Sequence, residues 1–280
     1  MQLTALAPLN PDQQQRHKLR NFLHSLLLLG GMVVLLAACG WIVAGWLGVI
    51  MAILLGAIGL SLSPSVSPQF VLHLFGARKL PEYEMAEIYA VVAELSRRAG
   101  LERPPRLFYI ASPTLNAFSV GSRGDAAIAM TSGLLSRLTL RELAGVLAHE
   151  LSHIRNNDMW VMGLADMISR LTRSMSFVGV LLLVLNAPLL LAGVEQVPWL
   201  LVLLLIFAPS IGTLLQLALS RTREFEADLD GAGLTRDPAG LAAALQKLER
   251  YQGRFWEDIF LPGRRAPDPS DSHDSSPGSD

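Results

Sequence analysis

The sequence predicts a mainly α-helical integral membrane protein, with four transmembrane helices and a cytoplasmic α+β domain. Its composition is the first indication. Hydrophobic residues make up 51% of the 280 residues and charged residues only 17%, and the mean hydropathy is +0.39. These values exclude a disordered chain and are atypical of a soluble enzyme. The net charge of −1 provides no general field to attract nucleic acid, so we expect no nucleic-acid partner.

A long stretch without charge near the N-terminus is the second indication. No Asp, Glu, Lys or Arg occurs between Arg20 and Arg78, and the 37 residues from Leu26 to Leu62 are almost continuously apolar. A single helix of this length, at about 1.5 Å per residue, is too long for a hydrocarbon core of about 30 Å. Two spans that turn near Gly40 to Gly48 fit instead, which predicts a transmembrane hairpin over residues 22–62. A cleavable signal peptide is the alternative for the first span, but the apolar run continues without a clear cleavage site.

A second stretch follows Arg173 and contains one charged residue, Glu195. Residues Phe177 to Ala192 and Pro198 to Leu219 read as two further spans, which predicts a second hairpin over residues 174–219. The alternative is a buried helical hairpin in a soluble protein. Two such long charge-free runs rarely share one globular core, so the membrane interpretation is favoured.

The distribution of positive charge predicts the orientation. All 23 Lys and Arg residues lie in residues 1–20, 78–173 or 221–265, and the expected outer loops contain none. The positive-inside rule then places both termini and the polar middle in the cytoplasm. The resulting segments are a cytoplasmic N-terminal segment (1–21), the first hairpin (22–62), the first part of a cytoplasmic domain (63–173), the second hairpin (174–219), the second part of that domain (220–261) and a disordered tail (262–280).

Local signals predict an α+β fold between and after the hairpins. We expect helices from Pro81 to Gly100, from Thr139 to about Asn156 and from Leu241 to Tyr251, and strands over Arg106 to Ile110 and Ala126 to Met130. Thr139 and Glu142 have the spacing of a capping box. The last 15 residues hold five Ser, four Asp and three Pro, too little apolar surface to form a core.

A metal-binding pattern lies on the helix that begins at Thr139. Residues 149–153 read His-Glu-Leu-Ser-His. His149 and His153, at i and i+4, share one helix face and can hold one metal ion, while Glu150 lies beside them as a candidate general base. Two incidental histidines on a helix are the alternative. Chance predicts roughly 0.005 occurrences in a chain of this composition, so the pattern is specific.

A third ligand is expected beyond the second hairpin, because a catalytic zinc takes three protein ligands. Glu224 and Asp228 are i and i+4 there, so Glu224 can ligate while Asp228 accepts a hydrogen bond from a ligating imidazole. By itself this segment also fits an acidic helix paired with Arg221 and Arg223. Glu226 lies about 200° round the helix from Glu224 and is expected to point away from the metal.

These residues resemble the HtpX-type membrane zinc metalloproteases, which are gluzincins related to the CAAX prenyl proteases. The resemblance extends over roughly residues 20–261. It includes both hairpins and the segments Asn116 to Phe118, Ser132 to Leu135, His149 to His153, Asn157 to Met159 and Ser220 to Asp228.

The resemblance implies a zincin-like protease domain with one zinc ion per chain. By it, His149, His153 and Glu224 bind the zinc, Glu150 is the catalytic base, and Asp228 supports a ligand. Asn116 to Val120 would be the edge strand against which an extended peptide lies, and Asn116, Ala117 and Phe118 would bind the substrate.

The implied activity is a zinc metalloendopeptidase in the bacterial inner membrane, acting at the cytoplasmic face on membrane or misfolded proteins, with the lipid bilayer as its other partner. No pattern in the sequence specifies an oligomeric state. The chain departs from the family after Leu261, where the usual His-Pro segment and closing helix are replaced by the Ser/Asp/Pro tail. A catalytically impaired zinc-binding membrane scaffold is therefore the alternative.

Overall fold

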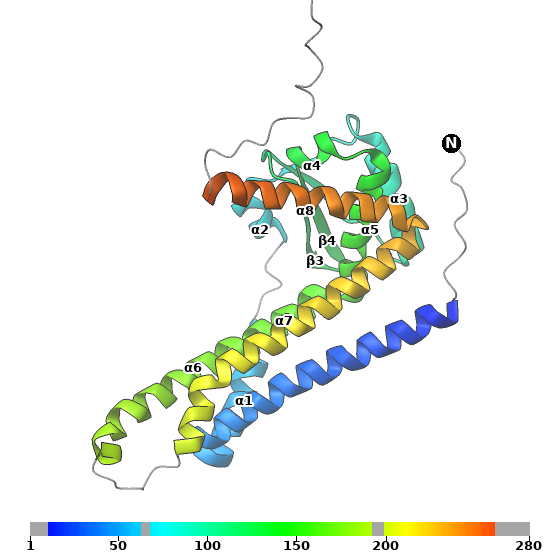
Figure 1. The fold of residues 1–280 in the computed structure, drawn as a ribbon. Helices are drawn as coiled ribbons and strands as arrows, with labels where there is room; N and C mark the ends of the chain where they lie inside the picture. The colour runs from blue at the N-terminus through cyan, green and yellow to red at the C-terminus, as the bar shows by residue number, and fades with distance from the viewer. Residues whose placement is uncertain (1–10, 63–67, 192–198, 261–280) are drawn as a thin grey trace, which may run out of the picture.

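The computed structural model describes residues 11–62, 68–191 and 199–260 (Figure 1). Residues 1–10, the loop with Glu195 and the tail of residues 262–280 lie outside this part, so the expectations made for them remain predictions. The elements are α1 (Pro11–Leu62), α2 (Pro68–Leu74), β1 (Arg78–Lys79), α3 (Ala86–Ala99), β2 (Arg106–Ile110), β3 (Ala117–Ser122), β4 (Asp125–Thr131), α4 (Ser132–Arg137), α5 (Leu140–Asn156), α6 (Asp158–Leu191), α7 (Trp199–Thr235) and α8 (Pro238–Phe260).

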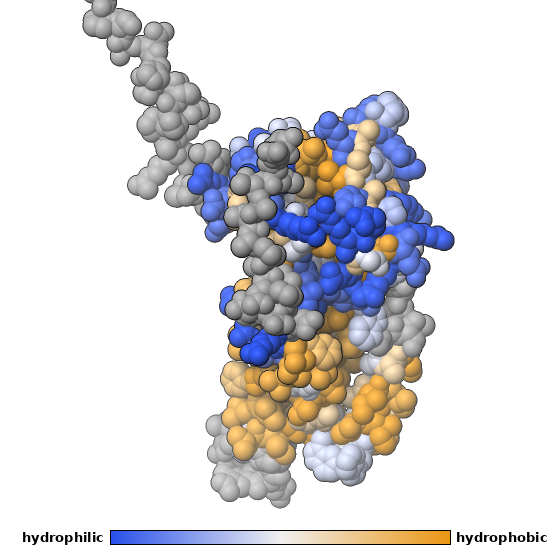
Figure 2. Space-filling view, turned by 90° about the vertical axis from the view of Figure 1, so that its right-hand side faces the viewer, coloured by the Kyte–Doolittle hydropathy of each residue, from blue (hydrophilic) through white to orange (hydrophobic). Residues whose placement is uncertain are grey.

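Three helices in the described part of the chain are long and apolar enough to cross a membrane: α1, α6 and α7. They pack along one another at one end of the molecule, and α7 continues into the smaller domain that contains the sheet (Figure 1). Apolar side chains cover the end formed by these helices, whereas polar side chains dominate the surface of the domain with the sheet (Figure 2). The division into an apolar helical part and a polar domain agrees with the predicted fold class.

The chain reverses direction inside α1. Ala44 (φ −149°, ψ 26°) and Gly45 (φ 59°, ψ −142°) interrupt the helix, and the positive φ of Gly45 is one that side chains with a Cβ rarely adopt. In a continuous helix, Gly40 and Gly48 would lie about 12 Å apart. A Cβ on Gly40 would nevertheless lie only 2.7 Å from the carbonyl oxygen of Gly48, so only glycine permits the two halves to approach this closely. The turn predicted near Gly40 to Gly48 is therefore present.

The smaller domain contains a four-stranded sheet of order β1-β2-β4-β3, in which β2 and β4 are parallel and the outer pairs antiparallel. The predicted strand over Arg106 to Ile110 is confirmed, and that over Ala126 to Met130 is one residue longer at each end. β3 and β4 form a hairpin in which Ser122 pairs with Asp125. β3 is an edge strand, since within the described residues it pairs only with β4, and β1 lies at the opposite edge.

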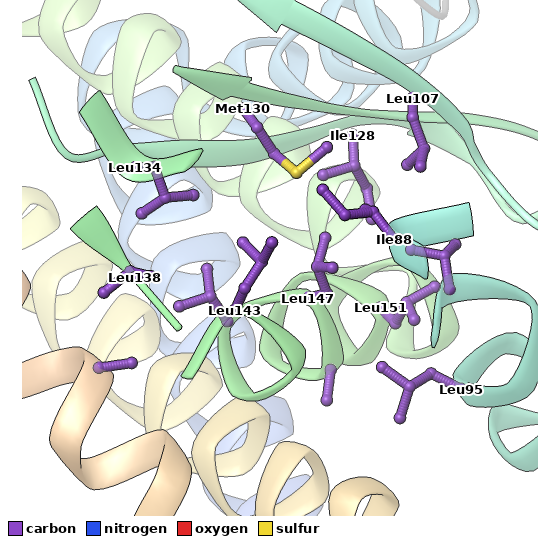
Figure 3. Packing of buried hydrophobic residues seen from close by; sticks show 14 of the residues in the cluster. Ile88, Leu95, Leu107, Ile128, Met130, Leu134, Leu138, Leu143, Leu147 and Leu151 are labelled. Atoms are coloured by element: carbon purple, nitrogen blue, oxygen red, sulfur yellow. The ribbon is translucent and has the colours of Figure 1, made fainter. Parts of the chain in front are cut away.

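Helix α5 is the centre of this domain. Its apolar side chains Leu143, Leu147 and Leu151 point toward the sheet, and they pack in one cluster with Ile128 and Met130 (Figure 3). α3 covers the same core from the side, and α8 crosses α5 on the other side. Leu147 and Leu151 are completely buried. This packing fixes the helix that carries the metal-binding pattern.

Candidate metal centre

Both ends of α5 are fixed by local hydrogen bonds. The backbone N–H of Thr139 donates to Oε2 of Glu142 over 2.9 Å, and the backbone N–H of Glu142 donates to Oγ1 of Thr139 over 3.3 Å, which is the predicted capping box. Lys247 of α8 also donates to Glu142 over 2.8 Å. At the other end, Asn157 adopts the left-handed conformation (φ 58°), ends α5 and lets α6 begin at Asp158.

Three potential metal ligands converge between α5 and α7. Nε2 of His149 lies 3.1 Å from Nε2 of His153 and 3.4 Å from Oε2 of Glu224, and the distance from His153 Nε2 to Glu224 Oε2 is 3.9 Å. Within the described residues this is the group of His, Cys, Asp and Glu side chains whose spacing suits one metal ion. The side chains of His149 and His153 are 13% and 14% exposed, whereas that of Glu224 is 58% exposed and lies toward solvent.

The close approach of α7 to α5 depends on Gly231. A Cβ at this position would lie 3.1 Å from the backbone nitrogen of His149 and 3.2 Å from its Cα. A larger residue would separate the helices at the level of the first histidine. Gly231 therefore allows Glu224, two turns earlier on α7, to reach the histidines of α5.

A carboxylate orients each imidazole. Nδ1 of His149 lies 2.9 Å from Oδ1 of Asp228, and Nδ1 of His153 lies 2.8 Å from Oδ2 of Asp158. Because a carboxylate only accepts hydrogen bonds, each Nδ1 is the donor and each Nε2 faces Glu224. Asp228, the expected partner of a ligating imidazole, is at hydrogen-bond distance from His149. No sequence pattern assigned a role to Asp158. The available signal was Asn157 directly before it, because Asn tolerates the left-handed conformation.

The charges at this site favour a cation. Burial disfavours the charged form of the His149 ring, but hydrogen bonds to Asp228 and Glu224 outweigh it and raise the pKa of His149 to about 10. Glu150 is buried, and this burial raises the pKa of its carboxyl despite the nearby histidines and a hydrogen bond with Ser119 of β3. Ser119 lies within the segment Asn116 to Val120 expected to be the edge strand, and it brings that strand into contact with the candidate base.

The predicted substrate-binding residues Asn116, Ala117 and Phe118 lie at the start of β3. Asn116 is exposed, and its backbone N–H and carbonyl are both hydrogen-bonded to Thr131. Ala117 packs on the face of the sheet covered by α5, whereas Phe118 packs on the opposite face against Phe75. The Phe118 ring is therefore directed away from the metal ligands. Because the backbone of Asn116 bonds to β4, alternation along the strand also directs the backbone of Phe118 toward β4 and that of Ala117 toward the open edge.

The donor set fits zinc. A tetrahedral zinc with bonds of about 2.0–2.1 Å separates neighbouring ligand atoms by about 3.3 Å. The three distances of 3.1, 3.4 and 3.9 Å are close to this value. Two imidazoles and one carboxylate leave a fourth position open, as catalytic zinc sites require.

Comparison with known proteins agrees with this geometry. The sequence model of peptidase family M48 matches residues 82–278. A protein named "Protease HtpX homolog" from Burkholderia ambifaria (strain MC40-6) is 33% identical over 237 residues, which cover 82% of this chain and 80% of that protein. One of the same name from Aquifex aeolicus (strain VF5) is 35% identical over 230 residues, 78% of this chain and 73% of that protein.

The chain belongs to peptidase family M48. Within that family it is an HtpX-type metalloprotease, as the resemblance implied. M48 metalloproteases in general depend on zinc, in accordance with the His-His-Glu group between α5 and α7. The three apolar helices and the HtpX homologues together indicate an inner membrane protein.

Proposed function

We propose that the protein is a membrane-anchored, zinc-dependent endopeptidase that cleaves membrane or misfolded proteins at the cytoplasmic face of the bacterial inner membrane. One zinc ion per chain is held by His149, His153 and Glu224. The observation that carries this proposal is the convergence of three ligand atoms from two helices, with Glu150 adjacent to them.

In the proposed reaction, Glu150 moves the proton. When bound, zinc supplies a Lewis acid that polarises the peptide carbonyl and lowers the pKa of water. The Glu150 carboxylate accepts the proton of the attacking water and then passes it to the leaving amine. Burial suits Glu150 to both steps. It raises the pKa of the carboxyl toward neutral pH, which makes the carboxylate a better proton acceptor and the carboxylic acid a suitable proton donor afterwards.

The substrate is proposed to bind as an added strand along β3. The outer edge of β3 offers backbone groups that can pair with an extended peptide. Of the residues Asn116, Ala117 and Phe118, Ala117 would contribute backbone contacts, because the backbone groups of the other two face β4. The hydrogen bond between Ser119 and Glu150 supports this arrangement, because it places the edge next to the base.

The proposed topology has four transmembrane segments, with both termini and the active site in the cytoplasm. The reversal at Gly45 supports two spans in α1, and α6 and α7 provide the other two. In this division, residues 22–62 and 174–219 are the hairpins, while residues 63–173 and 220–261 form one protease domain. The distribution of Lys and Arg supports the orientation.

A cleavage assay tests this function. The purified full-length protein in detergent should degrade an unfolded membrane protein, and a chelator should stop the reaction until zinc is restored. Zinc binding without any cleavage would favour the impaired scaffold instead. The M48 family model matches this chain through residue 278. The match extends beyond Leu261, the end of the resemblance inferred from the motifs, and this supports activity.

A further inference from the structure

A buried arginine lies behind the metal centre. The side chain of Arg223 on α7 is 9% exposed, and each nitrogen of its guanidinium faces a different group. Nε lies 2.7 Å from Oδ1 of Asp158, Nη2 lies 2.8 Å from Oε2 of Glu226, and Nη1 donates to Oγ of Ser25 over 3.4 Å. These partners come from α6, α7 and α1, so one side chain joins all three long helices.

Asp158 connects this arginine to a candidate metal ligand. Its side chain is 4% exposed, and its two oxygens are divided between Arg223 and Nδ1 of His153. The contacts therefore form a continuous series from Ser25 and Glu226 through Arg223 and Asp158 to His153. A guanidinium is permanently charged, so the ion pair with Oδ1 of Asp158 favours the orientation in which Oδ2 faces His153.

Stability alone does not account for this arrangement. The attraction between buried ions seldom exceeds the cost of removing them from water, and apolar side chains of the same volume often replace them without loss. A buried arginine with two carboxylates therefore suggests a specific task. Partners that orient a metal-binding imidazole are such a task, because they fix the tautomer and the direction of the ring.

The first membrane helix contributes a second polar contact to the same region. Nζ of Lys18 lies 2.7 Å from Oδ1 of Asp230 on α7, and Oδ2 of Asp230 accepts hydrogen bonds from Ser152 and Asn156 of α5. Lys18 and Ser25 are seven residues apart and thus lie on one face of α1. The cytoplasmic end of α1 in this way contacts α7 directly, and through Asp230 it is connected to α5.

We propose that Arg223 is a positioning residue of the metal site. It holds Asp158 so that His153 presents Nε2 to the metal, and through Ser25 it ties the orientation of His153 to the packing of the first membrane helix. This inference rests on the proposed zinc site, but not on catalytic turnover.

Zinc affinity of the purified full-length protein in detergent, measured by competition with a chromophoric chelator, tests the proposal. Arg223→Met should lower the affinity by about 10–100-fold, the usual effect of losing an outer partner of a metal ligand. Asp158→Asn should have a similar effect. The double variant should lose little more than either single variant, because both act through the same hydrogen bond to His153. Additive losses, or unchanged affinity in Arg223→Met, would overturn the proposal.

A matched control separates positioning from general stability. Arg141→Met removes another arginine–carboxylate pair, with Asp237, that has no contact with the metal ligands. It should leave zinc affinity unchanged. If Arg223→Met does not fold, Arg223→Lys and Ser25→Ala replace it. Lysine keeps the charge but not the three-way geometry, so both should show a smaller loss of affinity, and wild-type affinity in both would overturn the proposal.

The same measurements distinguish this inference from the proposed function. Wild-type protein that binds zinc but cleaves nothing contradicts the endopeptidase activity and leaves the comparison of affinities intact. Wild-type protein that binds no zinc contradicts both. Active protein whose affinity is insensitive to Arg223 contradicts only the positioning role.

Discussion

Nδ1 of His153 lies 2.8 Å from Oδ2 of Asp158. The two residues are i and i+5, and residues at this spacing do not lie on the same face of a helix. The left-handed Asn157 between the two helices makes the contact possible. The other imidazole, His149, is oriented by Asp228 of α7. The two histidines thus depend on different membrane helices, and the site is complete only when both α6 and α7 have packed against α5.

Glu150→Gln should abolish cleavage and leave zinc binding intact. Glutamine cannot accept the proton, whereas it leaves the three ligand atoms in place. The rate should fall by at least about 10²-fold, the lower range for loss of a general base. Metal content and peptide hydrolysis of the same preparation check this. Loss of zinc together with activity would mean that the roles of Glu150 and the ligands are misassigned.

Glu224→Gln should reduce zinc affinity more than Asp228→Asn. A neutral amide is a weaker ligand than a carboxylate, whereas Asp228→Asn only weakens the orientation of His149, typically by about 10–100-fold. Chelator competition on the two purified variants measures the difference. Equal affinities of Glu224→Gln and the wild type would remove Glu224 from the ligand set.

Glu249→Gln is the control for this comparison. Glu249 is an exposed acid on α8 and should leave zinc affinity unchanged. The sequence alone suggests Glu226 for this purpose, because it points away from Glu224 round the helix. In the structure Glu226 is buried against Arg223, so its substitution would disturb the series of contacts that leads to Asp158.

Local signals predicted the elements on which the site is built. The capping box, helical spacing and strand alternation identified α5 and β2 with their boundaries. Hydropathy was less accurate for helix ends, because it detects the membrane rather than the helix. The first span of the second hairpin was expected to begin at Phe177, yet α6 is helical from Asp158, through Asp166 and Arg170, which lie outside the apolar run. Similarly, α3 begins at Ala86 rather than Pro81, after a turn.

The contacts that require tertiary structure could not be predicted. Arg223 was considered only as a partner of acidic residues on its own helix, and its pair with Glu226 agrees with that alternative. Its contacts with Asp158 and Ser25 depend on how α1, α6 and α7 pack, which no spacing in the sequence encodes. The direction of the Phe118 ring likewise follows from the side of the sheet that α5 covers.

Reporter fusions should place Asp125 in the cytoplasm and Glu195 outside it. The reason is that Lys and Arg are confined to the segments expected inside. An alkaline phosphatase fusion at Glu195 should be active and one at Asp125 inactive, with the reverse pattern for a fluorescent protein that folds only in the cytoplasm. Activity of the phosphatase at Asp125 would invert the topology and move the proposed active site out of the cytoplasm.

Acid should weaken the protease domain partly through Glu142. Hydrogen bonds from Lys247 and Thr139 outweigh the effect of burial and lower the pKa of Glu142 below its ordinary value of 4.5. A carboxyl whose pKa is lower in the folded state contributes stability above the unfolded pKa, and this contribution is lost as the pH falls through the folded pKa. Glu142→Gln removes the charge at every pH. The variant should therefore unfold at a lower temperature than the wild type at pH 7, and the difference should shrink as the pH falls below 4.5.

Thermal unfolding of the detergent-solubilised protein between pH 7 and pH 3 measures this difference. Glu249→Gln should follow the wild type throughout, since Glu249 is exposed and has no part in the cap of α5. The cap holds only the first turn of the helix that carries His149. In Glu142→Gln at pH 7, the zinc affinity should therefore change less than the unfolding temperature does. A constant difference in unfolding temperature across the whole range would show that Glu142 acts through packing rather than charge.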